Sequence, residues 1–230
     1  SGGRLILGVG LGYRQEEFDA LNIAFNERAG RMEEGLQIIR RLWAEERVEF
    51  EGKHFKLRGI STYPRPIQRP GPPIWVGGWA DRAVRRAARL GDAWFPGPTA
   101  DLDTLKGCLA IYKEALKGAP VEELPLFREV FVAEDKAGLE KGRRALEGMY
   151  MADYVTWSHP NIPPQPTFDD LKRDRFIIGY PEECVSDIQR FKEELGVTHL
   201  ICRMHFYKMS QEVTLKCMKL FSQKVLPHFK

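Results

Sequence analysis

The sequence has little of several features that would indicate a function class directly. Its 230 residues hold only four cysteines, widely spaced and with no C-x-x-C pair, at Cys108, Cys184, Cys202 and Cys217. This pattern argues against a disulfide framework and predicts reduced, mostly buried thiols in a cytoplasmic protein. The five histidines show no metal-ligand spacing, so we expect no metal site. No apolar run approaches the roughly 18 residues that span a bilayer, so we expect no membrane segment.

An excess of charge of one sign is also missing. The chain carries 35 lysines and arginines against 32 aspartates and glutamates, a formal net charge of +3 with both signs mixed along the sequence. This balance is too even to indicate binding to nucleic acid or to an anionic membrane. Hydrophobic residues make up 43% of the chain, which is enough for the core of a globular protein.

Short apolar runs are the first positive feature. Most are uniformly apolar rather than alternating, which is typical of parallel strands covered on both faces. The runs are Leu5–Val9, Ile74–Val76, Ala93–Phe95, Phe127–Ala133 and His199–Met204. Helical patterns separate them, at Glu27–Ala44, Ala80–Leu90, Leu102–Leu116, Lys136–Tyr150, Pro181–Leu195 and Ser210–Val225. This alternation predicts right-handed βαβ units and an α/β fold with a parallel sheet.

Two insertions interrupt the alternation. Residues 46–72 include Val48–Leu57, which alternates apolar and polar residues around Glu51-Gly52 and predicts a β-hairpin, followed by a proline-rich stretch. Residues 151–178 include HPNIPPQP, which cannot form a regular helix and predicts an irregular segment. Long insertions of this kind tend to shape a substrate site or an interface.

A pair of glycines, Gly77 and Gly78, stands between the run ending at Val76 and the helix beginning near Ala80. Glycines let a backbone approach a ligand closely, and the N-terminus of a helix offers unpaired N–H groups, so this junction could hold a phosphate. Plain turn geometry explains the same glycines, and both interpretations stay open. Asp81 is expected to cap the helix.

The first strand ends in a similar pattern. Gly8, Gly10 and Gly12 precede Tyr13, but the third glycine comes one residue too early for the dinucleotide fingerprint. Tyr13 would lie at the carboxyl end of the strand, where ligands bind in parallel α/β folds. Alternatively, Tyr13 only covers the edge of the sheet.

Several stretches in fixed order resemble the bacterial luciferase-like monooxygenase superfamily. They are SGGRLILGVGLGYRQEEFDALNIAFNERAGRMEEGLQIIRRLW, EFEGKHFKL, PRPIQRPGPPIWVGG, AARLGDAWFPG and IIGYPEECVSDIQRFKEELGVTHL. The resemblance runs from Ser1 to about Leu200. It implies a (β/α)8 TIM-barrel fold and an oxidoreductase that acts on a small organic substrate by oxygenation or hydride transfer. The implied cofactor is reduced FMN or coenzyme F420, and the choice between them stays open.

The resemblance also implies an incomplete barrel in a single domain over residues 1–230. In the family, the strand that resembles Leu5–Val9 is about the fourth of eight, so strands four to eight would be present and the first three absent. The chain would then be a piece of a longer protein, or the gene would lack that part. Because an open sheet exposes an edge, we expect a homo-oligomer, a dimer or larger.

The resemblance carries cofactor contacts to seven positions. The backbone of Gly77, Gly78, Trp79 and Ala80 would contact the phosphate, Ala83 would lie beside it, and Gly12 and Tyr13 would lie near the cofactor. Family members often have a polar or acidic residue where Trp79 and Ala80 stand, so this chain would rely on backbone donors.

Catalytic residues are harder to assign, because several residues of the family's site lie in the early strands. His205 is a candidate general acid or base, or a polar residue at the rim. Arg203 is a candidate partner of an anionic substrate or cofactor tail, or one half of a structural ion pair.

Two further alternatives remain. A non-catalytic, truncated relative would bind flavin weakly or only pack against a partner. An aldolase-like phosphate-binding barrel would need a Schiff-base lysine at a strand end, and none of the predicted strands offers one.

Overall fold

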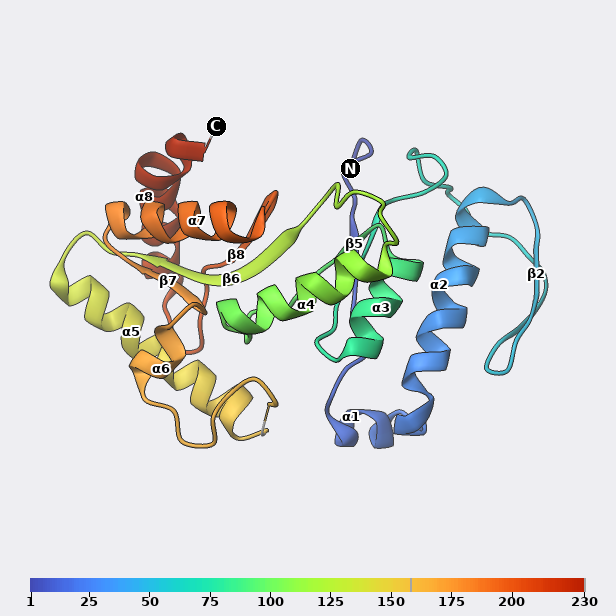
Figure 1. Ribbon diagram of the computed structural model, residues 1–230, viewed down its shortest axis with the longest axis horizontal. Helices are drawn as coiled ribbons and strands as arrows, with labels where there is room; N and C mark the ends of the chain where they lie inside the picture. Colours follow the sequence, from blue (N-terminus) through green and yellow to red (C-terminus); the bar gives the residue numbers. More distant parts are fainter. Residues whose placement is uncertain (158, 230) are drawn as a thin grey trace. The chain divides into compact units, whose positions relative to one another are not determined.

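Strands and helices alternate along the computed structural model, which describes residues 1–157 and 159–229 (Figure 1). The chain divides into two units. Unit 1 comprises Ser1–Phe95 and Ile111–Pro120, and unit 2 comprises Pro96–Ala110 and Val121–Lys230. Each unit contains its own three-stranded parallel sheet.

The sheet of unit 1 has the order β1 (Leu7–Val9), β4 (Ile74–Val76) and β5 (Ala93–Trp94). All three residues of the central strand β4 are buried, as its uniformly apolar sequence predicts. Because the strands are parallel, with Val9 opposite Val76 and Val76 opposite Trp94, their carboxyl ends lie at one edge of the sheet.

Helices of unit 1 bury small or apolar faces. They are α1 (Gln15–Ala20), α2 (Arg28–Ala44) and α3 (Asp81–Leu90). Ala83, Val84 and Ala87 form the buried side of α3, in the spacing expected for one helix face. Two ion pairs join α3 to α2, because Arg86 and Arg89 both reach the carboxylate of Glu33, at 2.8 and 2.7 Å.

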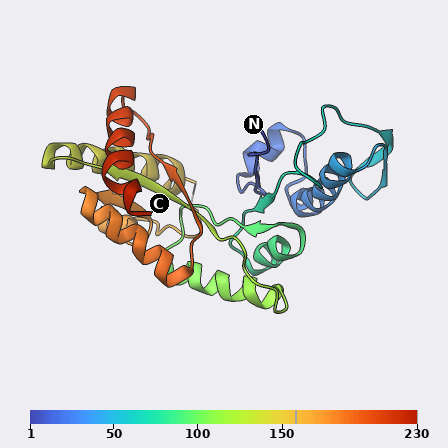
Figure 2. The ribbon, with the colours of Figure 1, turned by 90° about the horizontal axis from the view of Figure 1, so that it is seen from above.

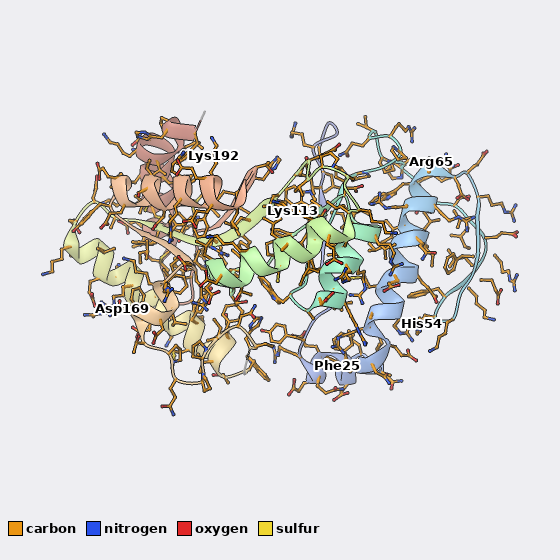
Figure 3. The ribbon with its side chains drawn as sticks, in the orientation of Figure 1. Phe25, His54, Arg65, Lys113, Asp169 and Lys192 are labelled. Carbon is orange, nitrogen blue, oxygen red and sulfur yellow. The ribbon has the colours of Figure 1, made fainter. Side chains whose placement is uncertain are left out.

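The hairpin of β2 (Val48–Glu51) and β3 (Lys56–Ile60) lies where the alternating pattern predicted it. Glu34 of α2 holds its loop, accepting the backbone N–H groups of Lys53, His54 and Phe55 at 2.8, 2.9 and 3.0 Å. His54 lies beside α2, so close that a Cβ at Gly30 would be 2.5 Å from its ring (Figure 3).

The sheet of unit 2 has the order β7 (Phe176–Gly179), β6 (Pro125–Val132) and β8 (His199–Arg203). The central strand β6 pairs with β8 through its first half and with β7 through its second half. Glu129 is the one residue of β6 that is opposite a residue of both neighbours in these registers. The strand β7 was not predicted.

Helices cover both faces of this sheet. Figure 2 shows α5 (Lys136–Tyr150) and α7 (Pro181–Leu195) on opposite sides of β6. Phe131 contacts α5 so closely at Gly142 that a side chain there would overlap its ring. On the other face Arg128 stacks on Phe191 of α7, with 4.9 Å between the guanidinium carbon and the ring centroid.

Two more helices belong partly or wholly to unit 2. One is α4 (Leu102–Ala115), whose residues up to Ala110 belong to unit 2 and whose end belongs to unit 1. The other is α8 (Gln211–Leu220), capped by Ser210. Its Cys217 accepts the N–H of Val132 at 3.2 Å through Sγ, which satisfies a backbone donor at the end of β6.

The segment 151–178 is less irregular than its prolines predicted. It contains a π-helical turn at Met151–Val155, the short helix α6 (Phe168–Lys172) and the first residues of β7. A capping box between Thr167 and Asp170 begins α6. Among the described residues, no helix is long and apolar enough to cross a membrane.

Candidate functional site

Three loops meet at the carboxyl edge of the sheet in unit 1, after β1, β4 and β5. The amide of Gly77 donates to the carbonyl of Val9 at 2.8 Å, and the amide of Phe95 donates to Val76 at 3.0 Å. The indole of Trp94 donates to the carbonyl of Gly78 at 2.9 Å. These bonds fix the backbone of the loop at Gly77 and Gly78 against both neighbouring strands.

Packing explains both glycines of this loop. A Cβ at Gly77 would lie 3.2 Å from the carbonyl oxygen of Phe95 and 3.3 Å from that of Val9. A Cβ at Gly78 would lie 2.5 Å from the Cβ of Ala83. The close approach of other protein atoms is therefore enough to require a glycine at each position. This agrees with the interpretation of the two glycines as plain turn geometry.

The amides of this junction differ in their availability to a ligand. The amide of Gly77 already donates to the carbonyl of Val9, and the phosphate contact that the resemblance carries to this residue stays a prediction. The amides of Gly78, Ala80, Asp81 and Arg82 donate to no group among the described residues. Four backbone donors thus remain where α3 begins, at the positive end of its dipole.

No side chain caps the N-terminus of α3. Ala80 is extended, exposed and supplies no side-chain cap, and the carboxylate of Asp81 pairs with Arg85 at 2.5 Å instead. Trp79 is half-buried, and Ala83 is buried against Gly78. The cap expected of Asp81 is not formed, so the first-turn amides remain able to donate hydrogen bonds to an anion from outside the helix.

The loop after β1 adds two of the predicted residues to this edge. Gly12 has a φ of +77°, which a side chain would strain, and a Cβ there would lie 3.1 Å from the ring of Phe18. Tyr13 follows with 45% of its surface exposed. In the structure, Gly12, Tyr13 and the residues from Gly77 to Ala83 lie at one edge of the sheet of unit 1.

Both catalytic candidates lie in unit 2, but their surroundings differ. His205 is exposed and makes no hydrogen bond with the described residues. Arg203, the last residue of β8, donates through Nη2 to the carboxylate of Glu129 and to the hydroxyl of Tyr154, the latter at 3.2 Å. Tyr150 donates to the second oxygen of Glu129 at 2.9 Å.

Burial governs the ionisation of this cluster. It raises the pKa of the Glu129 carboxyl, and the charge of Arg203 opposes that rise. It also raises the pKa of Tyr150 well above its usual value, and the adjacent Glu129 adds to the effect. Although burial alone would lower it, the pKa of Arg203 is raised by Glu129 and Tyr154. Arg203 therefore stays charged.

Glu129 and Tyr150 were missed by reasoning from the sequence. The available signal was the Arg128-Glu129 pair inside the otherwise apolar strand PLFREVFV. A charged side chain in a fully buried strand requires a partner, because an unpaired buried charge is very costly.

Two buried arginines hold the segment Pro96–Asp101 in unit 2. Arg128 donates to the carbonyls of Phe127 and Ala100 at 2.9 and 3.0 Å, and burial lowers its pKa to about 10, so it remains protonated at neutral pH. Arg175 donates to the carbonyl of Thr99 at 2.7 Å. Among the described residues, no group of three or more His, Cys, Asp or Glu could hold a metal ion.

Known proteins resemble this chain along most of its length. A family model described as luciferase-like monooxygenase matches residues 1–199. The F420-dependent glucose-6-phosphate dehydrogenase of Microbacterium testaceum is 29% identical, over 99% of this chain and 69% of that protein. The enzyme of the same name from Kineococcus radiotolerans is 30% identical, over 98% of this chain and 68% of that protein.

Solved structures share the fold. The monooxygenase RslO1 from Streptomyces bottropensis superposes with a TM-score of 0.85 and 28% identity, over 100% of this chain and 70% of that one. The oxygenating constituent of 3,6-diketocamphane monooxygenase from Pseudomonas putida, in complex with FMN, gives a TM-score of 0.71 at 20% identity, over 98% and 71%. The second likeness shows the α/β fold alone.

Proposed function

Because this chain belongs to the luciferase-like monooxygenase family, we propose that it is an oxidoreductase that uses reduced FMN or coenzyme F420 on a small organic substrate. Coenzyme F420 is favoured by the names of two relatives that match nearly the whole chain. The oxygenase alternative with FMN is supported by RslO1, a monooxygenase, and by a protein of the same fold whose structure holds FMN.

The observation that carries the proposal is the start of α3. The four amides of Gly78, Ala80, Asp81 and Arg82 have no acceptor among the described residues, and no side chain caps the helix. Both cofactors carry phosphate, and amides at a helix N-terminus suit an anion. These residues therefore fit the phosphate group of either cofactor. Gly78 and Ala83 pack closely together, so that the strand β4 connects tightly to α3.

When bound, the reduced cofactor supplies the electrons of the reaction, and the protein supplies binding and orientation. The amides at the start of α3 would fix the phosphate end. Gly12 and Tyr13, on the loop from the neighbouring strand β1, would lie at the same edge of the sheet. We assign no proton-transfer step, because His205 and Arg203 belong to the other unit.

A proline at position 81 tests the amide site directly. Proline is favoured at the first position of a helix and removes only the N–H, and Ala80 already has the extended conformation that a following proline requires. We expect Asp81→Pro to weaken cofactor binding about 10- to 100-fold relative to Asp81→Ala, since one hydrogen bond to a charged group contributes about 1.5–3 kcal/mol. Absorption and fluorescence titrations with FMN and with F420 measure the effect.

The control Asp81→Ala removes the same carboxylate and its pair with Arg85 but keeps the amide. Equal affinity of the two variants would place the phosphate elsewhere. Absence of binding by the unaltered protein to either cofactor would instead favour the non-catalytic alternative.

We also propose that the chain forms part of a TIM barrel and that it assembles into a homo-oligomer. The predicted strands β1, β4, β5, β6 and β8 would correspond to strands four to eight of a TIM barrel. The strand β7, which is also parallel to β6, is additional to that assignment. In unit 1, β1 lies at the edge of its sheet, and the preceding Leu5 and Ile6 are 52% and 37% exposed. These surfaces support a homo-oligomer. A monomeric mass by light scattering at micromolar concentration would contradict the assembly.

A further inference from the structure

A cavity of about 300 Å³ lies in unit 2, at the turn that leads from β6 into α5. One of its walls comes from this turn, and the other comes from α8, which contacts β6. All of its lining residues belong to unit 2, whereas the start of α3 belongs to unit 1. An apolar cavity of about 150 Å³ is enough to hold benzene, and small-molecule pockets begin at about 300 Å³. This cavity therefore has the volume of a ligand site.

Small side chains keep the cavity open on the side of β6 and α5. Ala133, Ala137 and Gly138 line it there. A Cβ at Gly138 would lie 3.2 Å from Oδ1 of Asp135 and 3.8 Å from the Cβ of Ala133, so the turn packs against itself. These short side chains cannot reach across to α8, which leaves the space between the two walls.

The inner surface of the cavity is apolar. The wall of α8 is a single face of the helix, since its apolar members follow at steps of four and three residues, and the floor is the buried end of β6. The Sγ of Cys217 accepts the amide of Val132 at 3.2 Å, and burial raises the pKa of this thiol, so it stays uncharged. The apolar residues are Val213, Cys217 and Leu220 on α8, and Phe131, Val132 and Ala133 at the end of β6.

The charged residues of the lining are already paired or solvated. Lys216 pairs with Glu134 at 2.8 Å, and both side chains are more than half exposed. Oδ1 of Asp135 accepts the amide of Gly138 at 2.7 Å. Lys141 is exposed, so water solvates its charge. A charged ligand would therefore lose hydration in the cavity without gaining a buried partner.

We propose that this cavity is a binding site for a small, uncharged apolar molecule, such as an aromatic compound of two rings. The molecule would displace water from the walls formed by Phe131, Val213 and Leu220, and the burial of these apolar surfaces would drive binding. An amphipathic anion fits less well, because two acidic residues accompany the two lysines of the lining. The site is independent of the function proposed above, which rests on unit 1.

Two dyes of similar shape test the choice of ligand. N-phenyl-1-naphthylamine and 1-anilinonaphthalene-8-sulfonate share an apolar body, both fluoresce more strongly when they leave water, and only the second is charged. We expect the neutral dye to bind saturably and at least about tenfold more tightly than the sulfonate, measured by fluorescence titration. No saturable binding of the neutral dye, or tighter binding of the sulfonate, would overturn the proposal.

Methyl NMR of the unaltered protein locates the dye. We expect the methyl resonances of Val132, Val213 and Leu220 to shift on saturation with the neutral dye. The control is Leu126, which is buried near the other end of β6, about 20 Å away at about 3.3 Å per residue, and its methyl resonances should not shift. Equal shifts at both ends of β6 would place the dye outside the cavity and contradict the proposal.

Filling the cavity gives an independent check. Val213→Phe adds a ring to the α8 wall, and Leu215→Phe adds the same ring further along the helix, at a position that is 55% exposed and outside the lining. We expect Val213→Phe to weaken binding of the neutral dye at least about tenfold and Leu215→Phe to leave it unchanged. Unchanged affinity in Val213→Phe would refute the site. If that variant does not fold, the methyl shifts of the unaltered protein decide the question.

Discussion

At the scale of single residues, Arg175 connects segments of unit 2 that are far apart in the sequence. Its guanidinium donates to the carbonyl of Asp170 at 3.0 Å, the carbonyl of Asn161 at 3.1 Å and the carboxylate of Asp101 at 3.2 Å. Removal would take this donor from all three groups and from the buried carbonyl of Thr99, and would leave the Asp101 carboxylate without its guanidinium partner. We expect Arg175→Met to lower the free energy of unfolding by about 3–5 kcal/mol, measured by urea denaturation.

The control for this variant is Arg144→Met. Arg144 also pairs with an acidic residue of unit 2, Glu140, but 77% of its side chain and 49% of that of Glu140 are exposed, so its loss is expected to change stability by under about 1 kcal/mol. A similar effect of both variants would show that the buried network contributes no more than a surface ion pair.

His159 gives unit 2 a dependence on pH. Its Nδ1 accepts the amide of Asn161 at 3.2 Å, so the proton of the neutral ring is on Nε2, which faces Thr99 Oγ1 at 3.4 Å. Burial lowers the pKa of His159, because the charged form is disfavoured. The folded state thus binds fewer protons than the unfolded state just below the unfolded pKa of about 6.5.

Stability should therefore fall as the pH is lowered from about 6.5 towards the folded pKa, with a slope of at most about 1.4 kcal/mol per pH unit. We expect His159→Gln to flatten this part of the curve, measured as the midpoint of urea unfolding between pH 5 and 7. An unchanged slope in the glutamine variant would assign the dependence to another group.

Single residues of the candidate site could be predicted from the sequence only in part. Gly77, Gly78 and Gly12 could be singled out because glycines at strand ends are a local pattern. Which amides stay available could not be predicted, since Gly77 donates to Val9 in a strand that is distant in sequence. Glu129 was detectable only as a charge in an apolar strand, and its partner Arg203 is 74 residues away.

At the scale of elements, α5 contains two glycines with opposite roles. A Cβ at Gly142 would overlap the ring of Phe131, whereas nothing lies within 4 Å of a Cβ at Gly148. We expect Gly142→Ala to destabilise the protein by about 1–3 kcal/mol, because the sheet and the helix must move apart. Chemical denaturation measures the change.

The matched control in the same helix is Gly148→Ala. It should stabilise the protein by about 0.5–1 kcal/mol, since alanine loses less conformational entropy than glycine and meets no neighbour. Equal effects of the two substitutions would mean that helix propensity, and not contact with β6, determines the result.

Most elements followed from local patterns, and the exceptions have physical reasons. The helices begin and end within about two residues of the expected positions, apart from the π-helical turn that ends the last one at Phe221–Val225. The strand β7 was missed because three of its four residues fall in the insertion 151–178, which was expected to be irregular, and because its partner β6 is distant in sequence. The helix α6 was missed because its capping box follows HPNIPPQP directly.

At the scale of the whole molecule, α4 contributes its two ends to different units. Tyr112 belongs to unit 1, where its ring centroid is 6.1 Å from that of Trp94, and Leu105 is buried in unit 2. We expect Tyr112→Ala to reduce hydrogen-exchange protection in β4 and β5 more than in β6 and β8, because each unit has its own core. Mass spectrometry of exchanged peptides measures this.

Leu105→Ala is the reciprocal variant and should lower protection mainly in β6 and β8. Equal loss across all four strands in both variants would show that the two units unfold together. The α/β class and the family of the whole molecule were recognisable from sequence, whereas the expectation of a single domain stays a prediction. The boundary between Ala110 and Ile111 falls inside a continuous helix, where no composition shift marks it.

The staggered pairing of β6 has a consequence for how the protein is made. A ribosome adds about 5–20 residues per second, so the 74 residues from Glu129 to Arg203 take roughly 4 to 15 seconds. Until then a nearly all-buried, eight-residue strand has left the ribosome without β8, one of the two strands that pair with it. Nascent chains on one messenger are therefore at risk of co-aggregating through this segment, and binding by a chaperone during synthesis would protect them.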